Sequence, residues 1–258
     1  MRLRIVLVEP LYEGNVGSVA RAMKNFGFSE LVLVKPCKIE DFGLAMASHA
    51  RDLIEGAKVV DALEDAVAGA NLVVGTTGVR GNSTNRHLRI PSLTPRDLAV
   101  RLGGTAGEVA LLFGREDDGL TRDELLACDV VVTIPTGSEY PIMNLSHAAA
   151  ILFYELSSVP PGDIPLASPE NVARLLDHFR AALEESEYYE HKIEKTMLML
   201  KRIFGRARLT DREVQTLRGV VRNLRWGAEH LGGDLEEGEE EEGRVQEDGE
   251  DEGLPKKS

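Results

Sequence analysis

The 258-residue sequence predicts an α/β protein: a parallel sheet with helices on both faces, followed by a small helical extension. Three observations support this fold class. Short aliphatic runs alternate with helical stretches over the first 157 residues. The runs are apolar throughout instead of alternating with polar residues, which is typical of strands buried on both faces. Beyond a Pro- and Gly-containing stretch, the sequence carries helical periodicity alone.

The expected strands and helices of the first part follow one another along the chain. Strands are predicted at Leu3–Val8, Leu31–Val34, Lys58–Val60, Leu72–Gly75, Val109–Phe113 and Val130–Ile134. Helices are predicted at 16–26, 44–55, 62–68, from Thr94 onward, at 121–127 and at 144–157. Two of them start on clear capping signals, since Thr94 precedes a proline and Thr121 can form a capping box with Glu124.

The remainder of the chain predicts an extension and a tail. We expect a first domain at 1–158, a linker at 159–168, a helical extension at 169–232 and an acidic tail at 233–258. One amphipathic helix is predicted from Pro169 to about Ile203, with Gly205 ending it. A capping box at Thr210 then starts a last helix that runs toward Leu231. The tail has almost no apolar residues, so disorder is expected there.

The net charge of −13 hides a segregation of charge. Residues 234–258 hold twelve acidic and three basic side chains, whereas residues 191–226 hold ten basic and three acidic ones. A segment with this basic excess suits contact with nucleic-acid phosphates, although a solvated positive face is the simpler explanation.

Several classes of protein are disfavoured. No apolar run is long enough to span a bilayer, and the first residues lack a signal-peptide pattern. Cys37 and Cys128 have no metal-ligand spacing, and His147 has no clustered partners, so no metal site is predicted. We therefore expect a cytoplasmic protein with reduced thiols and no membrane contact.

A long polar loop is predicted at residues 79–91, with Arg80, Arg86 and Arg89 among small polar residues. Loops of this length in compact domains are more often functional than idle, and three arginines suit phosphate contact. A solvated connection is the alternative.

Three stretches carry the functional signal. The first contains Asn15, Gly17 and Arg21 and ends on Phe26-Gly27; the second reads Phe113-Gly114-Arg115-Glu116 and continues to Gly119-Leu120-Thr121; the third is Met143-Asn144-Leu145-Ser146-His147-Ala148. In this order they resemble the three motifs of the TrmH-like (SpoU) branch of the SPOUT RNA methyltransferases, most closely the TrmJ type.

The resemblance implies the fold, the methyl donor and the assembly. It implies a SPOUT fold with a C-terminal trefoil knot, S-adenosylmethionine as methyl donor, and a homodimer whose active site forms near the interface. It also implies that the helical extension takes part in tRNA binding, in agreement with its basic charge.

Site residues follow from the resemblance at matching positions. Cofactor contact is expected from loops at the ends of predicted strands, where open α/β sheets bind ligands: Thr76, Thr77, Gly78, Gly114, Ile134, Ile142, Met143 and Asn144. Arg21 is expected to bind phosphate or stabilise a developing alkoxide, since guanidinium is a poor base. Asn15 is expected to position Arg21 or the ribose, and Glu116 to orient Arg21 or the donor pocket.

One position departs from the family pattern. Many TrmH-like proteins carry Ser where this chain has Ile142, so a hydroxyl role there does not transfer. Ser146 either substitutes for that hydroxyl in catalysis or only caps its helix.

The expected function is S-adenosylmethionine-dependent 2'-O-methylation of tRNA at nucleotide 32 of the anticodon loop, on cytidine alone or on uridine as well. The alternatives are methylation of another RNA, such as rRNA, and an RNA-binding protein that keeps the fold without catalysis.

Overall fold

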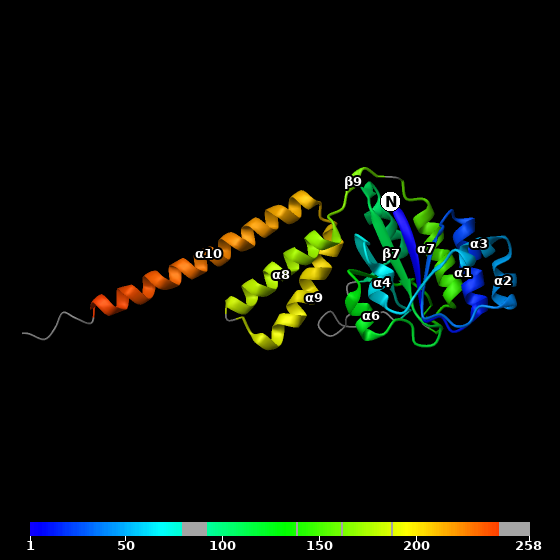
Figure 1. Ribbon diagram of the computed structural model, residues 1–258, viewed down its shortest axis with the longest axis horizontal. Helices are drawn as coiled ribbons and strands as arrows, with labels where there is room; N and C mark the ends of the chain where they lie inside the picture. Colours follow the sequence, from blue (N-terminus) through cyan, green and yellow to red (C-terminus); the bar gives the residue numbers. More distant parts are fainter. Residues whose placement is uncertain (79–91, 138, 161, 187, 243–258) are drawn as a thin grey trace, which may run out of the picture.

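The computed structural model describes residues 1–78, 92–137, 139–160, 162–186 and 188–242, with the backbone alone described over 228–242 (Figure 1). Its main sheet is parallel throughout, with the strand order β3-β2-β1-β7-β4-β8-β5. The strands are β1 (Arg2–Val8), β2 (Glu30–Val34), β3 (Lys58–Val60), β4 (Leu72–Thr76), β5 (Ser92–Leu93), β7 (Glu108–Phe113) and β8 (Val130–Val132). The predicted parallel α/β class is confirmed.

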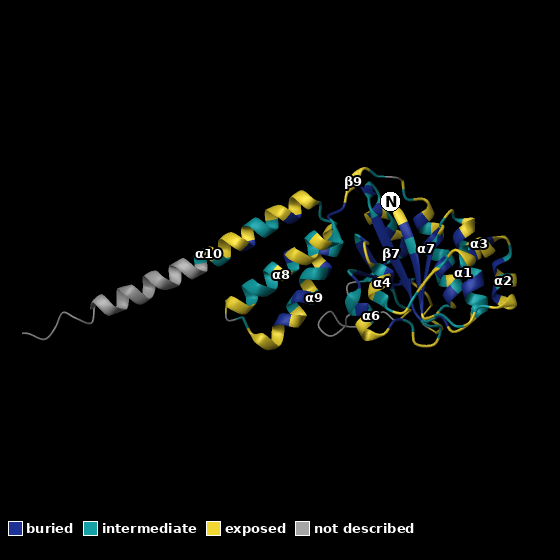
Figure 2. Ribbon diagram, in the orientation of Figure 1, coloured by how far each residue is buried: buried dark blue, intermediate teal, exposed yellow. Residues whose placement is uncertain are grey.

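Helices cover both faces of this sheet, because successive strand residues point to opposite sides. On one face, Leu3, Ile5 and Leu7 of β1 belong to the core that includes α1 (Glu13–Asn25), α5 (Pro95–Leu102) and α7 (Leu145–Ser157). On the other face, Val6 and Val8 belong to the core with α4 (Leu63–Val67) and α6 (Arg122–Ala127). The sheet is accordingly the most buried layer of the molecule (Figure 2).

The helix predicted at 44–55 is interrupted. The structure has α2 (Asp41–Ala47), a 3₁₀ turn η1 (Ser48–Ala50) and α3 (Arg51–Glu55). Ser48 has a φ of 55°, a left-handed conformation that breaks a right-handed helix. The apolar periodicity alone gave no signal for this turn.

The single helix predicted from Pro169 to Ile203 is wrong. The chain forms α8 (Pro169–Glu185) and α9 (Glu190–Ala207), which fold back on each other and pack with α10 (Asp211–Glu242). Folding back buries the apolar faces of all three helices in one small core, including Leu175, Phe204 and Val214. Gly205 does not end the helix but lies inside α9.

The residues Ile164–Ala167, which connect the sheet domain to the helical extension, are fixed by backbone hydrogen bonds. β9 (Ile164–Pro165) pairs with β6 (Thr105–Ala106), and the backbone N–H of Ala167 donates to the Leu209 carbonyl at 2.7 Å. α10 continues to Glu242, beyond the end predicted near Leu231, because glutamate is a good helix former. The arginine loop at 79–91 and the acidic residues 243–258 lie outside the described residues.

Within the described part of the chain, none of the helices combines the length and apolar composition that spanning a bilayer requires.

Candidate active site

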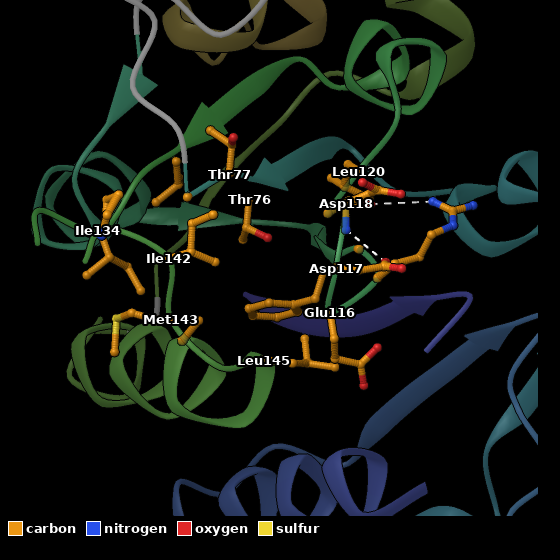
Figure 3. A pocket seen from close by; sticks show the side chains of 18 of the residues that line it. Thr76, Thr77, Glu116, Asp117, Asp118, Leu120, Ile134, Ile142, Met143 and Leu145 are labelled. Carbon is orange, nitrogen blue, oxygen red and sulfur yellow. Dashed lines mark hydrogen bonds between the residues drawn. The ribbon is translucent and has the colours of Figure 1, made fainter. Parts of the chain in front are cut away.

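A pocket opens at the carboxyl ends of β4, β7 and β8 (Figure 3). Its walls come from the loops that follow these strands and from the start of α7. In Figure 3 the apolar side chains of Ile134, Ile142 and Met143 lie on one side, and Asp117 and Asp118 lie on the other. Ligand sites at the carboxyl ends of parallel strands are expected for open α/β sheets.

The predicted cofactor residues gather in this pocket. All but one of them line it: Thr76, Thr77, Gly78, Gly114, Ile134, Ile142 and Met143. The Thr76 hydroxyl donates to the Leu112 carbonyl at 2.9 Å, which ties the β4 loop to β7. The exception is Asn144, which lies at the rim as the N-cap of α7. Leu120, Leu145 and Leu152 add an apolar lining that was not predicted.

Gly114 is required by close backbone contact. A Cβ atom at this position would lie 2.1 Å from the Gly119 carbonyl carbon and 2.3 Å from the Leu120 nitrogen. The loop turns back on itself here, with reciprocal backbone hydrogen bonds between Arg115 and Gly119 at 3.2 and 2.9 Å. Only glycine leaves room for this turn.

Glu116 is the centre of a hydrogen-bond network beside the pocket. Its carboxylate accepts from the backbone N–H of Leu11 at 2.8 Å, the N–H of Tyr12 at 3.3 Å and the side-chain amide of Asn15 at 2.8 Å. The carboxylate therefore orients the start of α1, and the predicted pairing of Glu116 with Arg21 is not formed within the described residues.

Asn144 joins this network to α7. Its Nδ2 donates to Asn15 Oδ1 at 3.1 Å, while its Oδ1 accepts from both the backbone N–H and the hydroxyl of Ser146, at 2.9 and 2.7 Å. The residues predicted for catalysis were Arg21, Asn15, Glu116, Asn144 and Ser146. All of these except Arg21 form one chain of hydrogen bonds. The Ser146 hydroxyl is engaged in the cap of α7, which favours the capping alternative over a substitute for the hydroxyl absent at Ile142.

Arg115 forms an ion-pair cluster that sequence reasoning missed. Its guanidinium pairs with Glu124 through two bonds of 3.1 Å and with Glu9 at 2.7 Å. Glu9 holds a left-handed φ of 47° in this arrangement. Burial opposes ionisation of Glu124, but its bonds with Arg115 and Thr121 keep the pKa of the carboxyl below its usual range. Glu124 was predicted only as a capping residue, and nothing in its spacing indicated the distant Arg115 and Glu9.

Arg21 stands apart from these residues. It is exposed on α1, six residues beyond Asn15, which corresponds to about 9 Å along a helix. Within the described part of the chain its guanidinium makes no hydrogen bond or ion pair. Neither Asn15 nor Glu116 therefore holds Arg21 within this chain, and of the alternatives expected for them the ribose and the donor pocket are left.

No metal centre is apparent in the described residues, which contain no cluster of three or more His, Cys, Asp and Glu side chains arranged for an ion. His147 of α7 is exposed. Burial raises the pKa of the Cys128 thiol to about 12, so this cysteine is a packing residue.

The basic side chains of the extension fall into two groups, one exposed and one bonded to the sheet domain. Lys192, Lys195, Arg212 and Arg222 are exposed on α9 and α10. Lys201, Arg202 and Arg208 instead donate to backbone carbonyls of the sheet domain. The charge excess predicted a single solvated or phosphate-binding face. In the structure, three of these cations make contacts inside the protein instead.

Comparison with known proteins agrees with this architecture. Residues 2–154 match the SpoU rRNA Methylase family, and residues 170–233 match the C-terminal domain of the tRNA methyltransferase TrmJ. The tRNA (cytidine-2'-O-)-methyltransferase TrmJ of Methanocaldococcus jannaschii is 39% identical over 223 residues, which cover 83% of this chain and 96% of that protein. The tRNA (cytidine/uridine-2'-O-)-methyltransferase TrmJ of Pectobacterium atrosepticum is 38% identical over 236 residues, covering 86% and 96%.

A solved structure of the same type is also similar. The crystal structure of TrmJ from Z. mobilis superposes with a TM-score of 0.67 at 29% identity, covering 87% of this chain and 99% of that one. The matches span the sheet domain and the extension together. The chain therefore belongs to the SpoU methylase family and, within it, to the TrmJ methyltransferases.

Proposed function

We propose that this protein uses S-adenosylmethionine to methylate the ribose 2'-hydroxyl of cytidine, alone or together with uridine, at nucleotide 32 of the tRNA anticodon loop. The observation that carries the proposal is the hydrogen-bond chain Glu116–Asn15–Asn144 at the rim of the pocket. It joins one polar residue from each of the three family motifs, next to a pocket whose lining suits S-adenosylmethionine. The names of the related proteins, with tRNA and 2'-O-methylation in common, support the substrate class.

The pocket residues suit S-adenosylmethionine. Leu120, Ile134 and Ile142 offer an apolar surface for an adenine ring, and the loops at Thr77 and Gly114 bring backbone close to a ligand. The carboxylates of Asp117 and Asp118 on the pocket wall suit a ligand that carries positive charge. When bound, S-adenosylmethionine would supply an electrophilic methyl group.

The roles of the protein's own groups follow from their positions. Glu116 and Asn15 keep the start of α1 against the pocket, and Asn144 aligns α7 with it. This arrangement pre-organises the walls between which the ribose would lie. Because the 2'-hydroxyl loses its proton on reaction, a guanidinium beside it stabilises the alkoxide that develops. We assign that role to Arg21.

We infer a homodimer, in which Arg21 of one protomer reaches the pocket of its partner. Within its own chain Arg21 is exposed and has no bond to the Glu116 network. The C-cap of its helix α1 is Phe26, whose ring packs edge-on against that of Tyr154 of α7, with the ring centroids 6.3 Å apart. Tyr154 is 65% exposed and Tyr12 is 63% exposed, and aromatic side chains of this kind are enriched at protein interfaces.

We assign tRNA contact to the exposed cations of α9 and α10. Lys192 and Lys195 project from α9, and Arg212 and Arg222 from α10. α10 extends away from the sheet domain, so these helices offer a long surface on which a nucleic-acid backbone can be followed (Figure 1). Trp226, on α10 and 62% exposed, adds an aromatic ring of the kind on which bases stack.

The test is transfer of a labelled methyl group from S-adenosylmethionine to unmodified tRNA transcripts, followed by mapping of the modified nucleotide. Methylation at nucleotide 32 is expected, and Arg21→Ala should lower its rate by about 100-fold, typical of losing one charge-stabilising donor. Arg96→Ala is the matched control, because Arg96 is another exposed arginine of the sheet domain, paired at the surface with Glu155.

Three other results would overturn parts of the proposal. Methylation of rRNA but not tRNA would change the substrate. S-adenosylmethionine binding without transfer to any RNA would indicate an RNA-binding protein. An active monomer at all concentrations would refute the dimer. Cytidine and uridine transcripts, assayed side by side, decide whether uridine is methylated as well.

A further inference from the structure

Two neighbouring cations of α9 dock the extension onto α6 of the sheet domain. Lys201 Nζ donates to the Ala127 carbonyl at 2.6 Å and lies 3.4 Å from the Leu126 carbonyl. Arg202 Nη2 donates to the Leu125 carbonyl at 3.0 Å. The last carbonyls of a helix have no partner in the helix itself and form the negative end of its dipole. The extension therefore supplies both the donors and the positive charge that the end of α6 requires.

The contact is closely packed and is buried at Arg202, whereas the side chain of Lys201 is 29% exposed. Arg202 is 5% exposed, an unusual location for an arginine unless it serves a specific contact. In the same helix, a Cβ atom on Gly205 would lie 2.7 Å from the Asp129 Cβ and 3.1 Å from the Asp129 carbonyl oxygen. The glycine lets the α9 backbone approach the start of β8, which explains why Gly205 is placed inside a helix.

Further bonds extend the contact to α5. Arg101 donates to the Arg206 carbonyl at 3.3 Å, and Arg208 donates to the Gly103 carbonyl at 3.3 Å. The extension is consequently fixed to two helices of the sheet domain in addition to its chain connection. Its orientation is set by contacts with defined donors and acceptors.

The helix that receives these cations also borders the pocket. α6 begins at Arg122, just after the pocket residue Leu120. Glu124 in its first turn pairs with Arg115, the neighbour of Glu116. One end of this short helix is thus bonded to the pocket loop and the other end to the extension.

We propose that Lys201 and Arg202 are positioning residues that determine which nucleotide of a bound tRNA reaches the pocket. This inference rests on the proposed function. The exposed cations of α9 and α10 hold the tRNA, whereas Lys201 and Arg202 hold those helices at one distance and angle from the site of methyl transfer. Loosening the contact of Lys201 and Arg202 with α6 should leave the affinity for tRNA unchanged. The ribose of a different nucleotide should then reach the pocket.

The experiment compares the double variant Lys201→Met/Arg202→Met with the wild-type full-length protein. Methionine keeps most of each aliphatic stem but removes the donors and the charge. We expect the affinities for S-adenosylmethionine and for tRNA to stay within about twofold, and kcat on tRNA to fall by about tenfold, the factor that one lost charged hydrogen bond corresponds to. Methyl groups should then appear on nucleotides flanking the wild-type position.

Three further variants separate positioning from other roles. Arg202→Lys, made with Lys201 unchanged, keeps a charged donor at both positions. This variant should methylate the wild-type nucleotide, unlike the double variant. Lys195→Met removes an exposed cation of the same helix, so it should weaken tRNA binding without changing the methylated position. Lys58→Met removes a lysine of β3, the edge strand separated from β8 by four other strands, and should change neither tRNA binding nor the methylated position.

The outcomes distinguish the two proposals. A double variant that methylates the wild-type nucleotide alone at the wild-type rate would overturn the inference and leave the proposed function standing. Loss of S-adenosylmethionine binding together with activity would assign the pair a purely structural role and also overturn it. A wild-type protein that transfers no methyl group to tRNA would overturn both.

Discussion

Replacing Arg115 with methionine tests the ion-pair cluster behind the pocket loop. The change keeps a side chain of similar length but removes the guanidinium that pairs with Glu124 and Glu9. The side chains of Arg115 and Glu124 are 15% and 14% exposed, whereas Glu9 is 38% exposed. The pair with Glu124 should therefore dominate the effect.

The magnitude follows from this burial. Removing one partner of a buried ion pair costs about 3–5 kcal/mol, because the other charge is left uncompensated. Glu124 keeps its hydrogen bonds from Thr121 and is not fully buried, which favours the lower end. The more exposed pair with Glu9 adds at most about 1 kcal/mol. We expect Arg115→Met to lower the free energy of unfolding by about 3 kcal/mol at neutral pH.

The loss should depend on pH. In the wild type the pKa of Glu124 is held below its usual value, so its stabilising contribution is present above the unfolded pKa of about 4.3 and is lost as the pH falls through the folded pKa. In the variant, burial without Arg115 raises the pKa of Glu124, and protonation relieves the penalty. The difference between variant and wild type should therefore shrink as the pH falls.

Urea unfolding at neutral pH and at about pH 4.5, near the unfolded pKa of Glu124, measures both predictions. Arg96→Met is the matched control, since Arg96 is 78% exposed and its surface pair with Glu155 should contribute less than about 1 kcal/mol. A destabilisation by Arg115→Met that matches the control, or one that is equal at both pH values, would refute the reasoning.

Two further predictions concern the pocket and its rim. Gly114→Ala should destabilise the protein by about 1–3 kcal/mol, because its Cβ would overlap the Gly119 backbone. It should also weaken S-adenosylmethionine binding in calorimetric titration. Gly219→Ala is the control and should leave binding unchanged, since a Cβ there meets nothing within 4 Å. Asn144→Ala and Thr94→Ala each remove an N-cap and should each cost about 1 kcal/mol in thermal unfolding. Only Asn144→Ala should also lower tRNA methylation, and equal activity of the two variants would show that Asn144 is merely a cap.

Much of the sheet domain could be predicted from the sequence because its signals are local. Buried parallel strands read as apolar runs, and Thr94, Thr121 and Asn144 cap their helices as their residue types suggest. The pocket residues were predicted from the resemblance to the family, at matching positions of its motifs. These positions lie at the carboxyl ends of parallel strands, which meet at one edge of the sheet, so the structure brings them together.

Features that depend on distant contacts were not predicted. α8 and α9 carry one continuous amphipathic pattern, and the break between them appears only because folding back buries both apolar faces in a shared core. Gly205 resembled a helix terminator, yet it serves the close approach of α9 to Asp129. Helical periodicity records which face is apolar but not which partner covers it.

The sequence by itself determined the fold class, the six longer strands and the helix caps at Thr94 and Thr121, because each depends on residues near one another in the chain. The resemblance to the family supplied seven of the residues around the pocket. Only the tertiary structure decided how charges pair. Arg115 meets Glu9 and Glu124, Glu116 holds the start of α1 instead of Arg21, and Lys201 bonds the end of α6. A charged side chain accepts many partners of similar chemistry, and which one it meets is set by the packing of the elements that carry them.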